Sequence, residues 1–118
     1  MDGHLVVVDM QRVFADPDSQ WATPGFAGIV PANSALAAAF GPAVTFTRFV
    51  APDRPTGAWV EYYEQWPFAL QPPHAPLWDV VPELARAAAA TAPTVDATTF
   101  GKWGPELAAR VGGSTMVL

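Results

Sequence analysis

One candidate catalytic residue is an aspartate that comes directly after a predicted buried strand. In "HLVVVDMQRVF", residues 4 to 14, a continuous apolar run from Leu5 to Val8 precedes Asp9. Such a run is typical of a central parallel strand covered on both faces. Ligands bind outside the carboxyl ends of such strands, and a partly desolvated carboxylate can act there as a general base. From position alone, a role for Asp9 in capping a turn is equally open.

The elements that must position Asp9 alternate between strand and helix. Beta-branched and aromatic residues predict a second strand over 43–50 ("AVTFTRFV"), and "PANSALAAAF" predicts a helix that has Pro31 near its first turn and ends before Gly41. Further helices are predicted over 82–90 and 104–111, and further strands over 94–100 and 114–118. With right-handed crossovers, this order gives an α/β fold: a parallel sheet with helices on both faces. The length of 118 residues predicts a single domain, 1–118.

Residues 51–80 form a long excursion rich in proline and aromatic residues, including "EYYEQWPFALQPP". A connection of that length inside a compact domain is usually functional or disordered. Because it carries so many rings to bury, we expect it to be ordered and to line a pocket. The candidate walls are Phe14, Tyr62, Tyr63 and Trp66, which would suit a small planar amide or a cyclic acid. The alternative is that these rings simply belong to the core.

Composition narrows the class of partner. Apolar residues make up 51% of the chain and charged residues 14%, the balance of a folded globular protein. The net charge is −5 and no basic run occurs, so nucleic acid and anionic membranes are not expected as partners. Residues 5–8 are too short an apolar run for a signal sequence, and we expect a cytoplasmic protein.

Four stretches, in chain order, resemble one family. "VVVDMQRVF" resembles the opening of the isochorismatase-like cysteine hydrolases, the superfamily that includes nicotinamidases, and the match rests on Asp9, Gln11 and Phe14. "VTFTRFVAPDRP" resembles that family's second strand with its Thr-Arg ending, "TTFGKWGPEL" the segment after its third strand, and "GGSTMVL" the strand leading to its nucleophile.

The resemblance implies a fold, a reaction and a set of site residues. The expected fold is isochorismatase-like, and the expected reaction is attack by a cysteine on a small substrate with an amide-type C–N bond. Asp9 would take the thiol proton, an adjacent base being the usual way to activate such a nucleophile. A lysine would stabilise charge nearby, and backbone N–H groups near the cysteine would hold the oxyanion. The substrate would contact Gln11, Phe14 and Trp66.

Two departures from the family pattern bear on activity. The chain has no cysteine, and the family's nucleophile would follow "TMVL", where the sequence stops. The family's lysine would stand at Ala97, three residues before Phe100, whereas Lys102 is the only lysine present. Lys102 could reach inward on its long stem, but the sequence favours a surface position at the start of a helix.

We therefore expect an incomplete domain, lacking the segment after the fourth strand, that is inactive as a 118-residue chain. The alternative is a non-catalytic relative or fragment that keeps the fold and a small-molecule pocket. The two separate on whether the reading frame continues past Leu118 into a Gly-Val-x-Thr segment with a cysteine. An uncovered sheet or helix face would also favour a homo-oligomer of undetermined size.

Other kinds of site are not expected. The family's zinc-binding branch has an aspartate and two histidines after the second strand, whereas this chain has Asp53 and no histidine there, so we expect no metal and no other cofactor. His4 and His74 are not at ligand spacing. An aspartyl-phosphate phosphatase would need a second acid where Gln11 stands. Neither a glycine-rich phosphate loop nor a Gly-x-Ser-x-Gly elbow occurs.

Overall fold

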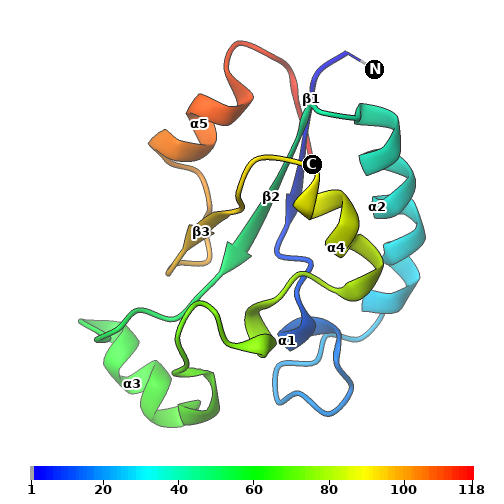
Figure 1. Cartoon of the computed structure of the whole chain (residues 1–118). Helices are drawn as coiled ribbons and strands as arrows, with labels where there is room; N and C mark the ends of the chain where they lie inside the picture. Colours follow the sequence, from blue (N-terminus) through cyan, green and yellow to red (C-terminus); the bar gives the residue numbers. More distant parts are fainter. Residues whose placement is uncertain (1) are drawn as a thin grey trace.

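A four-stranded parallel sheet forms the centre of the molecule, as the sequence predicts. The computed structural model describes residues 2–118. The strands are β1 (His4–Val8), β2 (Val44–Phe49), β3 (Val95–Ala97) and β4 (Met116–Val117), in the order β3-β2-β1-β4. The predicted α/β fold with a central first strand is confirmed (Figure 1).

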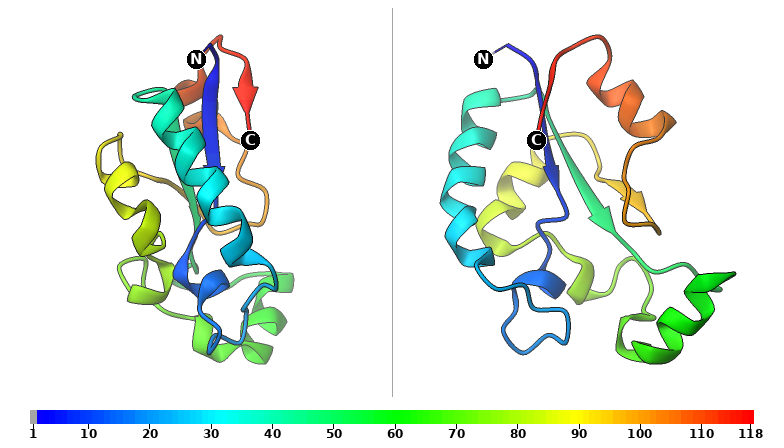
Figure 2. Two further views of the ribbon diagram at one scale, coloured as in Figure 1. Left: turned by 90° about the vertical axis from the view of Figure 1, so that its right-hand side faces the viewer. Right: turned by 180° about the vertical axis from the view of Figure 1, so that it is seen from behind.

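Helices cover both faces of the sheet. Side chains alternate along β1, so that Leu5 and Val7 pack in one core with α2 (Phe26–Phe40) and α4 (Pro82–Ala89), while Val6 packs with α5 (Pro105–Val111). Figures 1 and 2 show α5 on one side of the strands and α2 and α4 on the other. Leu5, Val6 and Val7 are each at most 2% exposed, as expected for a strand buried on both faces.

The strand order places a switch point beside β1. The chain builds outward from β1 to β2 and β3, and then returns through α5 to the other side of β1 as β4. Connections to the two neighbours of β1 thus run over opposite faces, and the loops at its carboxyl end diverge. Ligands bind at such points in open α/β sheets. Asp9, the residue that follows β1, lies there.

The excursion of residues 51–80 is ordered, as expected. It contains α3 (Ala58–Gln65) and two short 3₁₀ turns, Pro67–Ala69 and Pro76–Trp78. In Figure 1 the arrowheads of β1 and β2 point toward the end of the molecule that holds α1 (Arg12–Ala15) and α3. The excursion therefore lies at the same end of the sheet as Asp9.

Several elements differ from those that the sequence predicts. Helix α2 begins at Phe26 rather than at Pro31, which lies inside it. Pro31 is exposed, and the buried side chains of Phe26 and Val30 hold the first turn against the core. The four-residue helix α1 has no counterpart among the predicted elements, and β3 is three residues long rather than seven. No helix among residues 2–118 has the length and apolar character to cross a bilayer.

Candidate active site

Asp9 leaves β1 in an unusual backbone conformation. Its φ is 53°, and no other residue among 2–118, glycines apart, has a positive φ. Aspartate is one of the few residues that tolerate this left-handed region. The Asp9 N–H donates to Thr47 on β2, where both the carbonyl oxygen and Oγ1 lie at 3.2 Å. The turn thus bends the chain out of the strand while keeping Asp9 tied to the neighbouring strand.

Both oxygens of the Asp9 carboxylate have partners. The Thr47 hydroxyl donates to Oδ1 at 2.7 Å, and the Lys102 ammonium lies 2.9 Å from Oδ2. The Asp9 side chain is 20% exposed, so it is only partly removed from solvent. Each carboxylate oxygen thus accepts from a different element of the fold, which fixes the position of the group.

Lys102 reaches this carboxylate from the loop between β3 and α5. Its side chain is 4% exposed, so the surface position favoured by the sequence is wrong and the inward alternative is the one the structure adopts. Nζ donates to the carbonyl oxygens of Thr99 (2.7 Å) and Phe100 (2.9 Å) and lies 5.2 Å from the centroid of the Phe49 ring. With Asp9, these acceptors use all three N–H groups, which is how a buried ammonium is tolerated.

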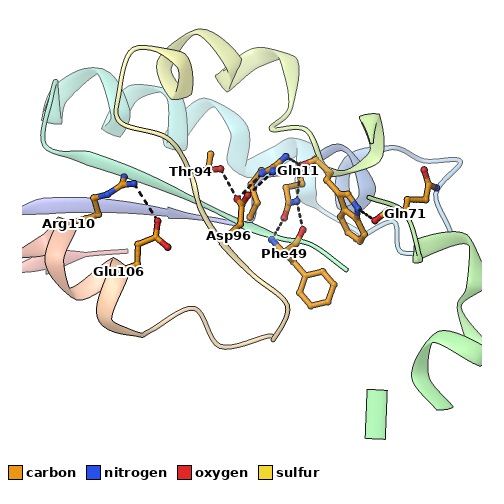
Figure 3. A network of polar contacts seen from close by, with 9 residues as sticks. Gln11, Phe49, Gln71, Thr94, Asp96, Glu106 and Arg110 are labelled. Carbon is orange, nitrogen blue, oxygen red and sulfur yellow. Dashed lines mark hydrogen bonds and ion pairs between the residues drawn. The ribbon is translucent and has the colours of Figure 1, made fainter. Parts of the chain in front are cut away.

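Gln11 forms a buried bridge between main-chain segments. It is 0% exposed. Its Nε2 donates to the carbonyl oxygens of Phe49 (2.8 Å) and Trp78 (2.9 Å), and its Oε1 accepts the Phe49 N–H at 2.8 Å. Figure 3 shows the pair of dashed lines joining Gln11 and Phe49. Both amide hydrogens are therefore committed, and Gln11 holds the end of β2, whose Phe49 ring lies beneath Lys102.

The predicted wall residues Phe14 and Trp66 meet at a residue that sequence reasoning missed. Trp21 stacks on Phe14 with ring centroids 6.3 Å apart, and it contacts Trp66 edge to face at 6.4 Å. Other rings around Trp21 are those of Phe49, Tyr62, Phe68 and Trp78. Trp21 stands alone among small and polar residues of a loop, so the only signal for it was its residue type.

The aromatic cluster continues to the ion pair. The Phe100 ring stacks on Phe49 at 5.7 Å and meets Trp59 edge to face at 5.2 Å. Phe100 is 67% exposed although it neighbours the buried Lys102. Apolar rings thus border the Asp9–Lys102 pair; of the two nearest, Phe49 is buried and Phe100 is open to solvent.

Comparisons with known proteins identify the family of this chain. A family model described as "Isochorismatase domain" matches residues 4–115. The chain belongs to the isochorismatase family. A similar solved structure is that of a cysteine hydrolase from Pseudomonas syringae pv. phaseolicola 1448A, with 30% sequence identity and a TM-score of 0.56. The match covers 70% of this chain and 40% of that one. No protein with a curated function matches the chain.

In this isochorismatase-family chain, a second ion pair lies away from Asp9. Arg48 of β2 donates from Nε and Nη2 to the Asp96 carboxylate of β3 at 3.0 and 2.8 Å, and the two residues are register partners. Burial would raise the pKa of Asp96, but the hydrogen bonds from Arg48 and from Thr94 outweigh it, and the pKa lies below its usual value. Figure 3 shows Thr94 beside Asp96. This pair joins two strands.

Two further features of this family member concern polar groups. Among residues 2–118, no three His, Cys, Asp or Glu side chains cluster as metal ligands would. Within the aromatic cluster, burial raises the pKa of Tyr63 to about 12, with a smaller contribution from Tyr62, and the Tyr63 hydroxyl is buried without a hydrogen-bond partner in this structure. Tyr63 is thus a neutral core residue at ordinary pH.

Proposed function

We propose that Asp9 and Lys102 are the general base and the charge-stabilising cation of a cysteine-hydrolase site that cleaves a C–N bond of a small substrate. The observation that carries the proposal is the 2.9 Å contact between Lys102 Nζ and Asp9 Oδ2 at the switch point of the sheet. The two residues are more than 90 positions apart in the sequence. Their contact requires a left-handed backbone at Asp9 and a buried ammonium at Lys102, and both are energetically unfavourable. Such costs are characteristic of functional sites.

The proposal gives the two residues different roles. Asp9 would take the proton of a thiol as its sulfur attacks the carbonyl carbon, and the proton would pass to the departing nitrogen as the C–N bond breaks. Water would then hydrolyse the thioester and release the acid. Lys102 already donates to three oxygens. Its role would therefore be to stabilise negative charge electrostatically rather than to transfer a proton.

The aromatic cluster supports a small planar substrate. The rings of Phe49 and Phe100 lie against each other beside Lys102, and those of Phe14 and Trp66 meet at Trp21. We propose that Phe14 and Trp66, as members of this cluster, contact the substrate. Both amide hydrogens of Gln11 are bound to main-chain carbonyls. We therefore propose that Gln11 affects substrate binding indirectly, by holding Phe49 in place.

We further propose that the 118 residues by themselves do not hydrolyse a substrate, because they contain no thiol that could attack its carbonyl carbon. The second candidate, a non-catalytic relative that keeps the fold and binds a small molecule, rests on the same observation. An incomplete single domain, a cytoplasmic location, the absence of a cofactor and a homo-oligomer stay predictions. Each of them rests on the sequence alone.

The test is an amide-hydrolysis assay on the purified chain, with nicotinamide and simple aromatic amides as substrates. We expect no turnover from a chain shown to be folded. Turnover that Asp9→Asn abolishes and Asp96→Asn leaves intact would contradict inactivity and require water as the nucleophile. If the reading frame does continue into a cysteine-containing segment, the longer polypeptide should hydrolyse an amide, and Asp9→Asn or Lys102→Met should abolish that activity. Full activity in both variants would overturn the assigned roles.

A further inference from the structure

Thr47 contacts both the backbone and the side chain of Asp9. It is the register partner of Val8, the last residue of β1, and it is 1% exposed. Its hydroxyl oxygen accepts the Asp9 N–H at 3.2 Å and donates its single hydrogen to Asp9 Oδ1 at 2.7 Å. One side chain therefore holds both the main chain and the carboxylate of Asp9.

We infer that Thr47 is a positioning residue that fixes the Asp9 carboxylate for proton transfer. The inference rests on the proposed function and extends it to a residue that touches Asp9 rather than the substrate. Lys102 alone would anchor only Oδ2 and leave the carboxylate free to rotate about that contact. The second anchor at Oδ1 fixes the carboxylate plane and determines which edge faces solvent. A general base needs this restriction, since misplacement by a fraction of an ångström weakens proton transfer.

The direction of the hydroxyl hydrogen follows from its surroundings. A threonine hydroxyl has one hydrogen and two lone pairs. The Asp9 N–H is shared between the Thr47 carbonyl oxygen and the hydroxyl oxygen, each at 3.2 Å, so the hydroxyl oxygen serves there as an acceptor and its hydrogen is left for Oδ1 at 2.7 Å. Because threonine is branched at Cβ, its χ1 is stiff and the hydroxyl is held in place before a substrate arrives.

The same strand supplies a matched control. Thr45 lies two residues earlier on β2, on the same face of the sheet, and is 2% exposed. Its hydroxyl pairs with His4 Nε2 at 2.7 Å and has no contact with Asp9. Thr45→Val and Thr47→Val therefore remove the same atoms from equally buried sites, and only the second removes a donor to the carboxylate.

The test is a carbon NMR measurement on chain labelled at the aspartate side-chain carboxyl carbons, with the Asp9 signal assigned by its loss in Asp9→Asn. We expect Thr47→Val to shift the Asp9 signal, Thr47→Ser to restore it, and Thr45→Val to leave it in place. An unmoved signal in folded Thr47→Val, or a shift that Thr47→Ser fails to reverse, would overturn the inference.

If Thr47→Val does not fold, the unsubstituted chain decides the question. The Thr47 hydroxyl proton should exchange slowly with water and correlate with the Asp9 carboxyl carbon, whereas fast exchange without that correlation would overturn the inference. The readout needs no turnover. Failure of the proposed function would appear only in the amide assay, so the two failures are distinguishable.

Discussion

Two of the ion pairs among residues 2–118, Arg48–Asp96 and Lys102–Asp9, are formed by the fold in different ways. Arg48 and Asp96 face each other across adjacent strands in register, with side chains 15% and 34% exposed. Lys102 and Asp9 belong to no strand, are 4% and 20% exposed, and require a lysine side chain turned inward from an exposed loop and a residue at φ 53°. The register of the sheet brings Arg48 and Asp96 together, whereas the Asp9–Lys102 contact requires an unfavourable backbone conformation and a buried charge.

That difference agrees with a structural role for the strand pair and with the function proposed for Asp9 and Lys102. Half-exposed cross-strand pairs are common and contribute modestly to stability. A buried pair that depends on a strained backbone is a poor way to stabilise a fold, because well-packed apolar residues would often be as stable. The Asp9–Lys102 pair is therefore better explained by the chemistry proposed for it than by stability.

The largest expected effect on stability comes from replacing Gln11, which holds the end of β2 beside the proposed Asp9–Lys102 site. Gln11→Ala leaves the Phe49 N–H and carbonyl without their Gln11 partners and leaves the Trp78 carbonyl with only the 3.4 Å bond from Arg48 Nη1, so the free energy of unfolding should fall by about 3 kcal/mol. Urea denaturation measures it. Gln71→Ala is the control, because Gln71 is exposed and its side chain bonds only the Phe68 carbonyl. Equal losses in the two variants would contradict this role of Gln11.

Removing the cation should have the next largest effect. Lys102→Met keeps the apolar stem but leaves Asp9 Oδ2 and the carbonyls of Thr99 and Phe100 without their donor, at a cost of about 2 kcal/mol in unfolding free energy. Arg110→Met is a comparison on α5, since Arg110 pairs with Glu106 at 3.6 Å near solvent. A smaller loss for Lys102→Met than for Arg110→Met would be incompatible with a buried, committed ammonium.

The backbone of Asp9 gives a sharper test of strain. Glycine adopts a positive φ freely and alanine does not, so Asp9→Gly should be more stable than Asp9→Ala by about 1 kcal/mol, although both lack the carboxylate. Thermal or urea unfolding of the two variants measures the difference. At Asp96, on a regular strand, the order should reverse. The same order at both positions would argue against strain at Asp9.

The smallest effect is the pH dependence of the structural pair. Because the pKa of Asp96 is lower in the folded chain than its usual 3.8, the pair stabilises the fold above that pH and the contribution is lost as pH falls through the folded value. The effect should be small, since 34% of the Asp96 side chain is exposed. Arg48→Met should flatten the stability profile in that acidic window, and an unchanged profile would refute the assignment.

Strand pattern can be predicted from the sequence, whereas the path of a loop cannot. Asp9 is predictable because it comes directly after an apolar strand, and the parallel sheet is predictable from the alternating elements. The spacing from Phe100 would place the lysine at Ala97 and leaves Lys102 at the surface, whereas the Lys102 side chain turns back to two carbonyls of its own loop and to Asp9, contacts that no sequence pattern reveals. Pro31 sets the start of α2 too late, since an exposed proline is tolerated when Phe26 and Val30 anchor the turn before it.

The most direct measurement is a pair of double-mutant cycles in urea, one combining Asp9→Asn with Lys102→Met and the other combining Asp96→Asn with Arg48→Met. Each cycle isolates the coupling between two side chains from the cost of each substitution alone. The account predicts a coupling of at least about 1 kcal/mol for Asp9 and Lys102, larger than that for Arg48 and Asp96. Additive effects at Asp9 and Lys102, with coupling confined to the strand pair, would contradict it.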